Sequence, residues 1–252
     1  MSPWRVLVEH GLSAHVHMAR DAALAEEAQP TVRCFTWSPP AVSLGWKQIA
    51  PAWVERVTGQ LAGVDSVERP TGGGIAFHGS DVSIAIVVPR RWEFPLASIM
   101  QTVCESARRL CGAHGLETTC AFNVPADARI TYCLTQPSAY ALFAGERKLA
   151  GFALRRYPNS WLVQGSLLIR PIPAPLSHRI PEELRCQLQA RAISLSEATH
   201  SMLDERTVAV QWAQQWSSWW HSDFTDFNML TPTRVMTDSY RGASTPSSTI
   251  SV

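Results

Sequence analysis

Three consecutive glycines lead into an apolar strand in the segment Arg-Pro-Thr-Gly-Gly-Gly-Ile-Ala-Phe-His-Gly, residues 69–79. Glycine lets the backbone approach a ligand closely and present bare N–H groups, as an acyl carbonyl or a phosphate would need. The segment matches neither the Walker pattern nor the dinucleotide fingerprint. Taken alone it is also typical of a tight turn, so its meaning depends on the motifs around it.

Two further motifs lie toward the C-terminus. The segment Ala-Gly-Glu-Arg-Lys-Leu-Ala-Gly-Phe-Ala, residues 144–153, predicts a turn that places Lys148 at the start of the next strand. A lysine fixed there would point its ammonium at a developing oxyanion, or at a reacting carboxylate and phosphate. A solvated turn lysine is the alternative. The segment Gln-Gly-Ser, residues 164–166, begins another apolar strand.

Hydrophobic periodicity around these motifs predicts a mixture of helices and strands. Helices are expected at residues 17–28, 52–61, 96–115 and 204–221. Strands are expected at residues 32–37 and 41–44, near Val67, at 81–88 and within 130–169. The apolar end of residues 81–88 is typical of a central strand covered on both faces. This order favours an α/β (α+β) fold with a mixed β-sheet flanked by helices.

The chain length is consistent with one catalytic domain. At 252 residues the chain can bury one sizeable core, and we place this domain at residues 1–228, with its core at about residues 30–220. Residues 229–252 are rich in Ser, Thr and Pro and are expected to form a flexible tail.

Charge and hydropathy exclude several classes of partner. Lys and Arg number 22 against 21 acidic residues, and a net charge of +1 provides no broad field for nucleic acid or an anionic membrane. The longest strongly apolar run, residues 84–88, is far below the ~20 residues of a spanning helix. Residues 1–5 lead into no signal-type apolar segment. We therefore expect a cytoplasmic protein without nucleic-acid or membrane partners.

The cysteines argue against a metal centre. The six cysteines are scattered without a CxxC pair, which disfavours both a zinc site and a disulfide framework. Most are expected to be small buried residues, and at least one is a candidate nucleophile.

In order, the motifs resemble the biotin/lipoate protein ligase and octanoyltransferase superfamily over about residues 17–220. The helix motif Met-Ala-x-Asp-x-Ala-Leu matches residues 18–24, and the turn motif Leu-Gly-x-x-Gln matches residues 44–48. The Arg-x-Thr-Gly-Gly-Gly/Arg-x-x-x-His motif matches residues 69–78. Gly-x-Lys-x-x-Gly-x-Ala matches residues 145–153 with one extra residue, and Gln-x-Gly-Ser matches residues 164–166 with one position absent. The resemblance implies a class II synthetase-like sheet in a single catalytic domain.

The resemblance also implies a site. Lys148 would contact the acyl carbonyl, and the triple glycine with His78 would form the wall of the acyl pocket. The substrate-binding positions are then Arg69, Thr71, Gly72, Gly73, Gly74, His78, Gly151, Ala153 and Gly165. Arg69 and Thr71 would support the glycine segment. Two departures from the family are Gly79, where Asp is common, and the apolar Phe152 and Leu154 near the lysine.

The branch of the superfamily depends on Cys133. Residues 130–140, Ile-Thr-Tyr-Cys-Leu-Thr-Gln-Pro-Ser-Ala-Tyr, resemble the Cys-Phe-x-x-Pro-Ser-x-Tyr segment of one octanoyltransferase class, whose cysteine carries octanoyl as a thioester. Antiparallel strands joined near Gly145 would place the Cys133 sulfur beside the Lys148 ammonium, which would stabilise a thiolate. The alternative is a buried strand cysteine. The other class has Pro-Cys-Gly after the Gly-Ser strand, whereas residues 169–173 contain no cysteine.

Three functions remain at this point. The first is a ping-pong transferase without a cofactor, which takes octanoyl or lipoyl from an acyl-carrier protein to a lysine of a lipoyl-carrier domain or a glycine cleavage H-type protein. The second is a lipoate-protein ligase that uses ATP and magnesium to form an acyl-adenylate, for which three glycines are suitable. The third is a non-catalytic protein that binds an acyl carrier or a lipoyl domain.

Overall fold

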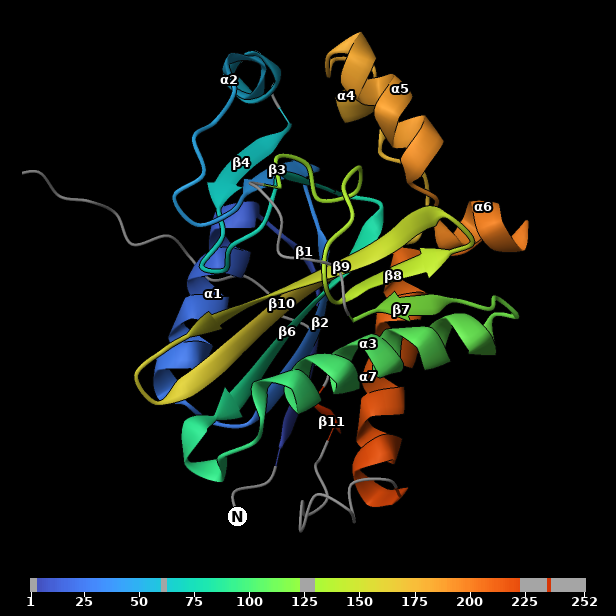
Figure 1. The fold of residues 1–252 in the computed structure, drawn as a ribbon. Helices are drawn as coiled ribbons and strands as arrows, with labels where there is room; N and C mark the ends of the chain where they lie inside the picture. The colour runs from blue at the N-terminus through green and yellow to red at the C-terminus, as the bar shows by residue number, and fades with distance from the viewer. Residues whose placement is uncertain (1–3, 60–62, 123–129, 223–234, 237–252) are drawn as a thin grey trace, which may run out of the picture.

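The computed structural model describes residues 4–59, 63–122, 130–222 and 235–236. Its centre is an eight-stranded mixed sheet, whose arrangement can be followed in Figure 1. The strand order is β11-β1-β2-β6-β10-β9-β8-β7. The bounds are β1 Arg5–Leu12, β2 Thr31–Trp37, β6 Asp81–Pro89, β7 Thr119–Ala121, β8 Ala141–Ala144, β9 Arg147–Arg156, β10 Ser160–Leu168 and β11 Val235–Met236. β1 runs parallel to β2, while β2, β6, β10, β9, β8 and β7 pair antiparallel in turn.

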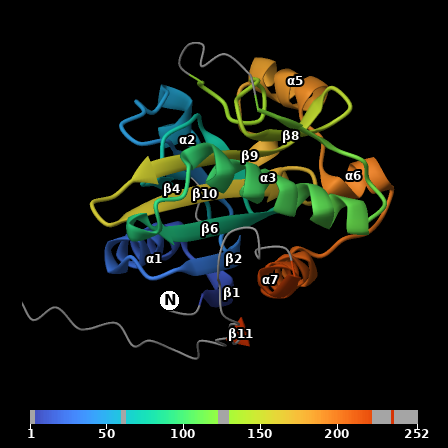
Figure 2. The ribbon, with the colours of Figure 1, turned by 60° about the horizontal axis from the view of Figure 1, so that its bottom comes forward.

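Helices cover both faces of this sheet, which confirms the predicted fold class (Figures 1 and 2). α1 (Ala14–Glu27) packs on one face, and α3 (Leu96–Ala113) and α7 (Glu205–Ser222) pack on the other. In β6 every residue is buried. Alternation along β6 sends Ile84 and Ile86 toward the α3 and α7 side, and Ala85 and Val87 toward α1. The prediction of a central strand covered on both faces is therefore confirmed.

A second, three-stranded sheet lies beside the first. Its order is β4-β3-β5, with β4 Asp65–Glu68, β3 Ala41–Leu44 and β5 Ala76–His78. The remaining helices are α2 Ala52–Gly59, η1 Arg90–Trp92, α4 Ala174–Ser177, α5 Glu182–Arg191 and α6 Leu195–Thr199. Apolar residues of α2 and α5 share one cluster with the small sheet, including Trp53, Leu184 and Phe77. The small sheet brings the triple glycine, which follows β4, next to β9 and β10 of the large one.

The prediction of strand character throughout residues 130–169 is wrong at its beginning. Residues 130–140 are turns and loop, apart from a single bridge between Ile75 and Tyr132. The Gln136 side-chain oxygen accepts from the backbone N–H groups of Thr131 and Tyr132, at 2.6 and 3.0 Å. Because a side chain satisfies these donors, the segment turns back on itself instead of joining the sheet.

Other boundaries agree closely with the sequence. α1 begins at Ala14, three residues before the predicted start at residue 17. Of the predicted tail, residues 229–252, the structure describes only Val235–Met236, which pair with β1 as β11. The rest of the tail lies outside the described residues. The domain boundary therefore stays a prediction. No helix in the described part of the chain is long and apolar enough to cross a membrane.

Candidate active site

A cavity of about 80 Å³ opens between the two sheets. Ten of the eleven predicted site residues line it: Arg69, Gly72, Gly73, Gly74, His78, Cys133, Lys148, Gly151, Ala153 and Gly165. The structure thus brings together residues of four motifs that are separate in sequence. The eleventh residue, Thr71, lies outside the lining and hydrogen-bonds to Gln164, which does line the cavity.

Apolar side chains make up much of the remaining wall. They come from α1, β2, β6, β9 and the loop before Cys133, and they are Met18, Phe35, Trp37, Ile84, Ile130 and Phe152. A wall of this composition suits a hydrocarbon chain, because burying apolar surface is favourable and non-directional. The apolar Phe152, which departs from the family pattern, is part of this wall.

Cys133 lies on the loop of residues 130–138, called here the cysteine loop, and it is half-buried. Its backbone N–H donates to the Ile75 carbonyl oxygen at 2.8 Å, so the residue just before β5 positions the loop. The Cys133 sulfur lies 2.9 Å from the point where a Cβ on Gly151 would stand. The absence of a side chain at Gly151 therefore leaves the space beside the sulfur open.

Lys148 is 1% exposed at the start of β9, and its ammonium faces the same point. The Lys148 Nζ lies 3.5 Å from the missing Gly151 Cβ. It donates to the carbonyl oxygens of Cys133 and Gln136, at 2.7 and 3.1 Å, and to the Ser138 Oγ at 2.7 Å. These three bonds match the three protons of an ammonium, so Lys148 fixes the cysteine loop as well as placing a cation beside the sulfur.

Burial lowers the pKa of Lys148, because a desolvated ammonium is disfavoured, and negative charge on the Cys133 sulfur opposes this shift. Burial likewise lowers the pKa of Arg69, again opposed by Cys133. Both cations therefore interact with the sulfur.

Arg69 holds the glycine loop, defined as residues 71–74. Its guanidinium donates to the Ser43 carbonyl oxygen and Oγ, at 2.9 and 2.8 Å, and to the carbonyl oxygens of Gly72 and Gly74, at 3.1 and 2.8 Å. Gly73 has a φ of +97°, which favours glycine. A Cβ on Gly74 would lie 2.9 Å from the Ile130 carbonyl oxygen, so the glycine loop packs directly on the cysteine loop.

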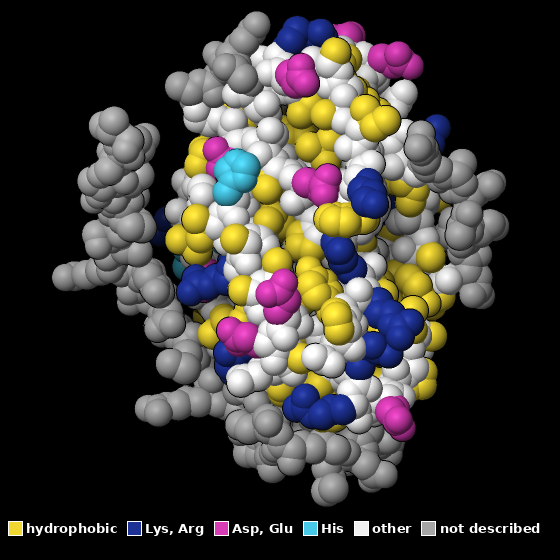
Figure 3. Space-filling model, turned by 90° about the vertical axis from the view of Figure 1, so that its left-hand side faces the viewer, with side chains coloured by type: hydrophobic (Ala, Val, Ile, Leu, Met, Phe, Trp, Pro, Cys, Tyr) yellow, Lys and Arg dark blue, Asp and Glu magenta, His cyan; other side chains and the backbone are white. Residues whose placement is uncertain are grey.

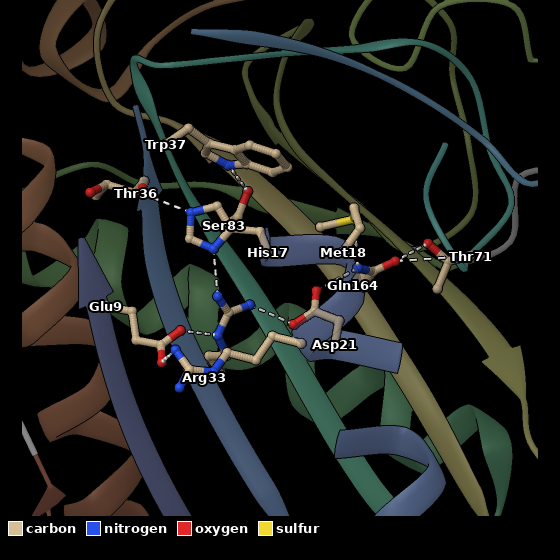
Figure 4. A network of polar contacts seen from close by, with 11 residues as sticks. Glu9, His17, Met18, Asp21, Arg33, Thr36, Trp37, Thr71, Ser83 and Gln164 are labelled. Carbon is tan, nitrogen blue, oxygen red and sulfur yellow. Dashed lines mark hydrogen bonds and ion pairs between the residues drawn. The ribbon is translucent and has the colours of Figure 1, made fainter. Parts of the chain in front are cut away.

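A buried polar network ties the glycine loop to α1 and β10 (Figure 4). The Gln164 Oε1 accepts from the Thr71 hydroxyl at 2.7 Å, and the Gln164 Nε2 donates to Asp21 at 2.6 Å. Asp21 in turn accepts from Arg33 at 2.6 Å. The side chain of Gln164 is therefore fixed at both ends, and the position of the glycine loop depends on buried charges outside the cavity.

Arg33 is fully buried, and its charge is balanced by neighbouring carboxylates. It forms ion pairs with Asp21 and Glu9, and it donates to the imidazole Nδ1 of His17 (Figure 4). The His17 Nε2 lies 3.1 Å from the Thr36 carbonyl oxygen, which only accepts, so Nε2 carries the proton. Burial and the Arg33 charge lower the pKa of His17 to about 3, and the ring is neutral.

We expect His17 to make the fold sensitive to acid. Its pKa falls from 6.5 when unfolded to about 3 when folded, so the unfolded chain binds the proton more readily and stability is lost as pH falls below 6.5. Between pH 7 and pH 5 the free energy of unfolding should fall by about 2 kcal/mol more in wild type than in His17→Gln. Urea unfolding at both pH values measures this. His15→Gln, exposed on the same helix, should behave as wild type; an equal pH dependence in His17→Gln would contradict the assignment.

His78 is held as part of the wall. Its Nδ1 lies 2.8 Å from the Asp81 Oδ2, its Nε2 lies 2.6 Å from the Ser43 Oγ, and its ring stacks on Trp37 with centroids 3.9 Å apart. Burial opposes ionisation of Asp81, but His78 and the hydrogen bond from Ser166 outweigh it and hold the pKa of Asp81 below its usual value. Because both ring nitrogens of His78 have hydrogen-bonding partners, the ring is held in place as part of the cavity wall.

Several residues of the site were not predicted as such. Gln164, Asp21, Gln136 and Ser138 belong to quoted motifs, yet no role was assigned to them. Their position in those motifs was the only signal in the sequence. Gln164 acts through contacts with Thr71 and Asp21, which lie 93 and 143 residues away in sequence. Ser138 acts through the geometry of its loop, which brings it to Lys148. Among the described residues, no group of three or more His, Cys, Asp or Glu side chains is arranged to hold a metal ion.

We expect Gly151→Ala to obstruct the space between the sulfur and the ammonium. The new methyl would lie 2.9 Å from the Cys133 Sγ and 3.4 Å from the Lys148 Cε, closer than such atoms normally approach. The free energy of unfolding should fall by about 1–3 kcal/mol, and alkylation of Cys133 by iodoacetamide should slow about tenfold. Gly112→Ala is the matched control, because its Cβ would meet nothing within 4 Å. Unchanged alkylation in Gly151→Ala would show that this space is not the route to the sulfur.

Comparison with known proteins identifies a family and several relatives. The lipoyl protein ligase A/B catalytic domain matches residues 13–217. Octanoyltransferase LipM of Symbiobacterium thermophilum is 31% identical over 217 residues, which are 77% of this chain and 78% of that protein. Octanoyltransferase LipM of Exiguobacterium sibiricum is 27% identical over 220 residues, with the same coverage of 77% and 78%.

Solved structures share the fold. The bi-partite lipoate protein ligase of Thermoplasma acidophilum, solved in a study of that ligase and its E2 lipoyl domain, superposes with a TM-score of 0.66 at 16% identity, over 94% of this chain and 87% of that one. A lipoate-protein ligase A bound with ATP superposes with a TM-score of 0.68 at 17% identity, over 94% and 89% of the two chains.

Proposed function

This chain belongs to the lipoyl protein ligase A/B catalytic domain family, and we propose that it passes an octanoyl group through a Cys133 thioester to a lysine of a lipoyl-carrier domain. It is an enzyme of protein lipoylation, like its octanoyltransferase relatives. One observation supports the thioester mechanism: the Cys133 sulfur and the Lys148 ammonium both face the space left open beside Gly151.

The first half-reaction is a thioester exchange. The Cys133 sulfur attacks the carbonyl carbon of an octanoyl thioester on an acyl-carrier protein, and the carrier thiol leaves with the proton that the Cys133 thiol gave up. Negative charge develops on the carbonyl oxygen during the attack. The Lys148 ammonium, which is itself 1% exposed, stabilises this charge at close range. The octanoyl chain lies along the apolar wall near Met18 and Phe152.

The second half-reaction forms an amide. The neutral amine of the acceptor lysine attacks the octanoyl-Cys133 carbonyl, the carbon–sulfur bond breaks, and the proton lost by the amine returns to the Cys133 sulfur. Thioester and amine give amide and thiol, so no cofactor is consumed. Acyl transfer by this route needs no ATP, in contrast to the ligase alternative.

Intact mass spectrometry tests the proposal. Incubation with octanoyl-acyl-carrier protein, without ATP, should add one octanoyl group to the enzyme. Addition of a lipoyl domain should then remove the adduct and add one octanoyl group to the domain. If no adduct forms, and pyrophosphate is instead released from ATP when octanoate or lipoate is added, the chain is a ligase and the thioester route is wrong.

A further inference from the structure

An exposed aromatic and cationic surface lies next to the glycine loop and the cysteine loop. It is carried by residues 45–49, called here the mouth turn, and by Arg155 and Arg156 on β9. Trp46 is 46% exposed and Ile49 is 81% exposed, although both are large and apolar. On the face of the molecule that Figure 3 views, Lys and Arg side chains lie beside exposed hydrophobic ones, with acidic side chains among them.

The mouth turn bridges the two loops that enclose the reacting groups. The Trp46 N–H donates to the Thr71 carbonyl oxygen at 2.9 Å, on the glycine loop. The Gln48 Nε2 donates to the Thr131 carbonyl oxygen at 3.0 Å, on the cysteine loop. The close approach of Gly45 to the Gly73 carbonyl oxygen leaves no room for a side chain between them. A protein that docks on the mouth turn therefore lies next to both the glycine loop and the cysteine loop.

Cations without a carboxylate partner accompany the exposed aromatic ring. The Arg155 guanidinium carbon lies 3.8 Å from the centroid of the Trp46 ring, and Arg155 donates to the Pro70 carbonyl oxygen at 2.8 Å. The Lys47 Nζ lies 5.7 Å from the same centroid. Within the described part of the chain, Lys47, Arg155 and Arg156 form no ion pair. A partner with carboxylates would supply the missing counter-charges.

From this arrangement we propose that the mouth turn and Arg155 form the docking surface for the acceptor domain, through an acidic face beside its target lysine. The assignment rests on the proposed function. A lysine side chain has only a four-carbon stem, so the folded surface of the acceptor must itself lie against the mouth for its amine to reach Cys133. Trp46 and Ile49 bury apolar surface in the interface, and Lys47 and Arg155 fix its orientation.

Steady-state transfer to a purified lipoyl domain with an unmodified lysine tests the surface. Trp46→Ala and Lys47→Glu should each raise the KM for the lipoyl domain about tenfold, and Lys47→Glu should weaken its dependence on salt. Acylation of Cys133 by a small thioester, octanoyl-N-acetylcysteamine, should stay unchanged in both. The matched controls are Arg179→Glu, an exposed cation near α4, and Met202→Ser, a residue that is 97% exposed between α6 and α7.

Two results would overturn the docking surface. One is an unchanged KM for the lipoyl domain in both variants. The other is a raised KM for octanoyl-acyl-carrier protein alone, which would assign the surface to the donor. Calorimetric titration of the enzyme with the lipoyl domain measures docking separately from the proposed chemistry. If the wild type forms no Cys133 adduct, the proposed function fails. Weaker binding of the lipoyl domain by Lys47→Glu would still support the docking surface, and binding equal to that of the wild type would overturn it.

Discussion

Cys133→Ser is expected to form no octanoyl adduct and to lower kcat/KM for octanoyl transfer about a thousandfold or more, which corresponds to ~4 kcal/mol of transition-state stabilisation. A thiolate is intrinsically a strong nucleophile, whereas a serine hydroxyl needs a general base. Among the described residues, no His, Asp or Glu side chain is hydrogen-bonded to the Cys133 sulfur. Within the described part of the chain, no base is therefore held in place to activate a serine at this position.

The fold should survive this change, because Cys133 is half-buried and its fixed contact is made by the backbone N–H to Ile75. Thermal unfolding by circular dichroism should show a transition close to that of wild type. Cys186→Ser is the matched control, since Cys186 is exposed on α5, and it should keep full transfer activity and a normal adduct. An adduct that persists in Cys133→Ser, or that disappears in Cys186→Ser, would contradict Cys133 as the nucleophile.

The architecture was largely predictable because its elements carry strong local patterns. The apolar side chains of residues 81–88 point to both faces of the strand, so β6 is expected to be buried on both faces, as it is. The stripe of α3 repeats at helical spacing and packs against the sheet as expected. These patterns depend on neighbours within one turn or one strand, so sequence alone carries them.

The conformation of the cysteine loop was not predictable in the same way. Its β-branched start is typical of a strand, but the side chain of Gln136 captures backbone donors that a strand would use. The predicted meeting of Cys133 and Lys148 is nevertheless present, for a different reason. It arises because Lys148 reaches across to the carbonyl oxygens of Cys133 and Gln136, and not because two paired strands carry the two residues.

The buried charges around Arg33 are the clearest limit of sequence reasoning. Arg33 interrupts a strand that is buried along its whole length, and its partners come from β1 and α1. Spacing along the chain does not reveal that these segments enclose one cation. Its link to Thr71 runs through Asp21 and Gln164 and is purely tertiary. Gln164 lines the cavity, whereas Arg33 and Asp21 lie outside the lining, so the position of the glycine loop also depends on residues that do not line the cavity.

Lys148→Met is expected to slow acylation of Cys133 about a hundredfold, or ~2.7 kcal/mol, because the negative charge that develops on the carbonyl oxygen loses its neighbouring cation. Methionine has a similar length but no charge and no donors. The carbonyl oxygens of Cys133 and Gln136 and the Ser138 hydroxyl would each lose the bond that now fixes the cysteine loop. The sulfur would then lose both its neighbouring cation and its fixed position.

Stopped-flow or quenched mass analysis of the first half-reaction measures this loss directly, since it excludes the acceptor domain. Arg147→Met is the matched control: it removes a cation from the preceding position, but Arg147 is exposed, so acylation should continue at the wild-type rate. The pH dependence supplies a second measure. Because burial lowers the pKa of Lys148, deprotonation of the ammonium should slow acylation at a pH below the ordinary lysine value of 10.5, and Lys148→Met should lack that decline. Equal acylation rates in Lys148→Met and Arg147→Met would leave the ammonium without a role in the chemistry.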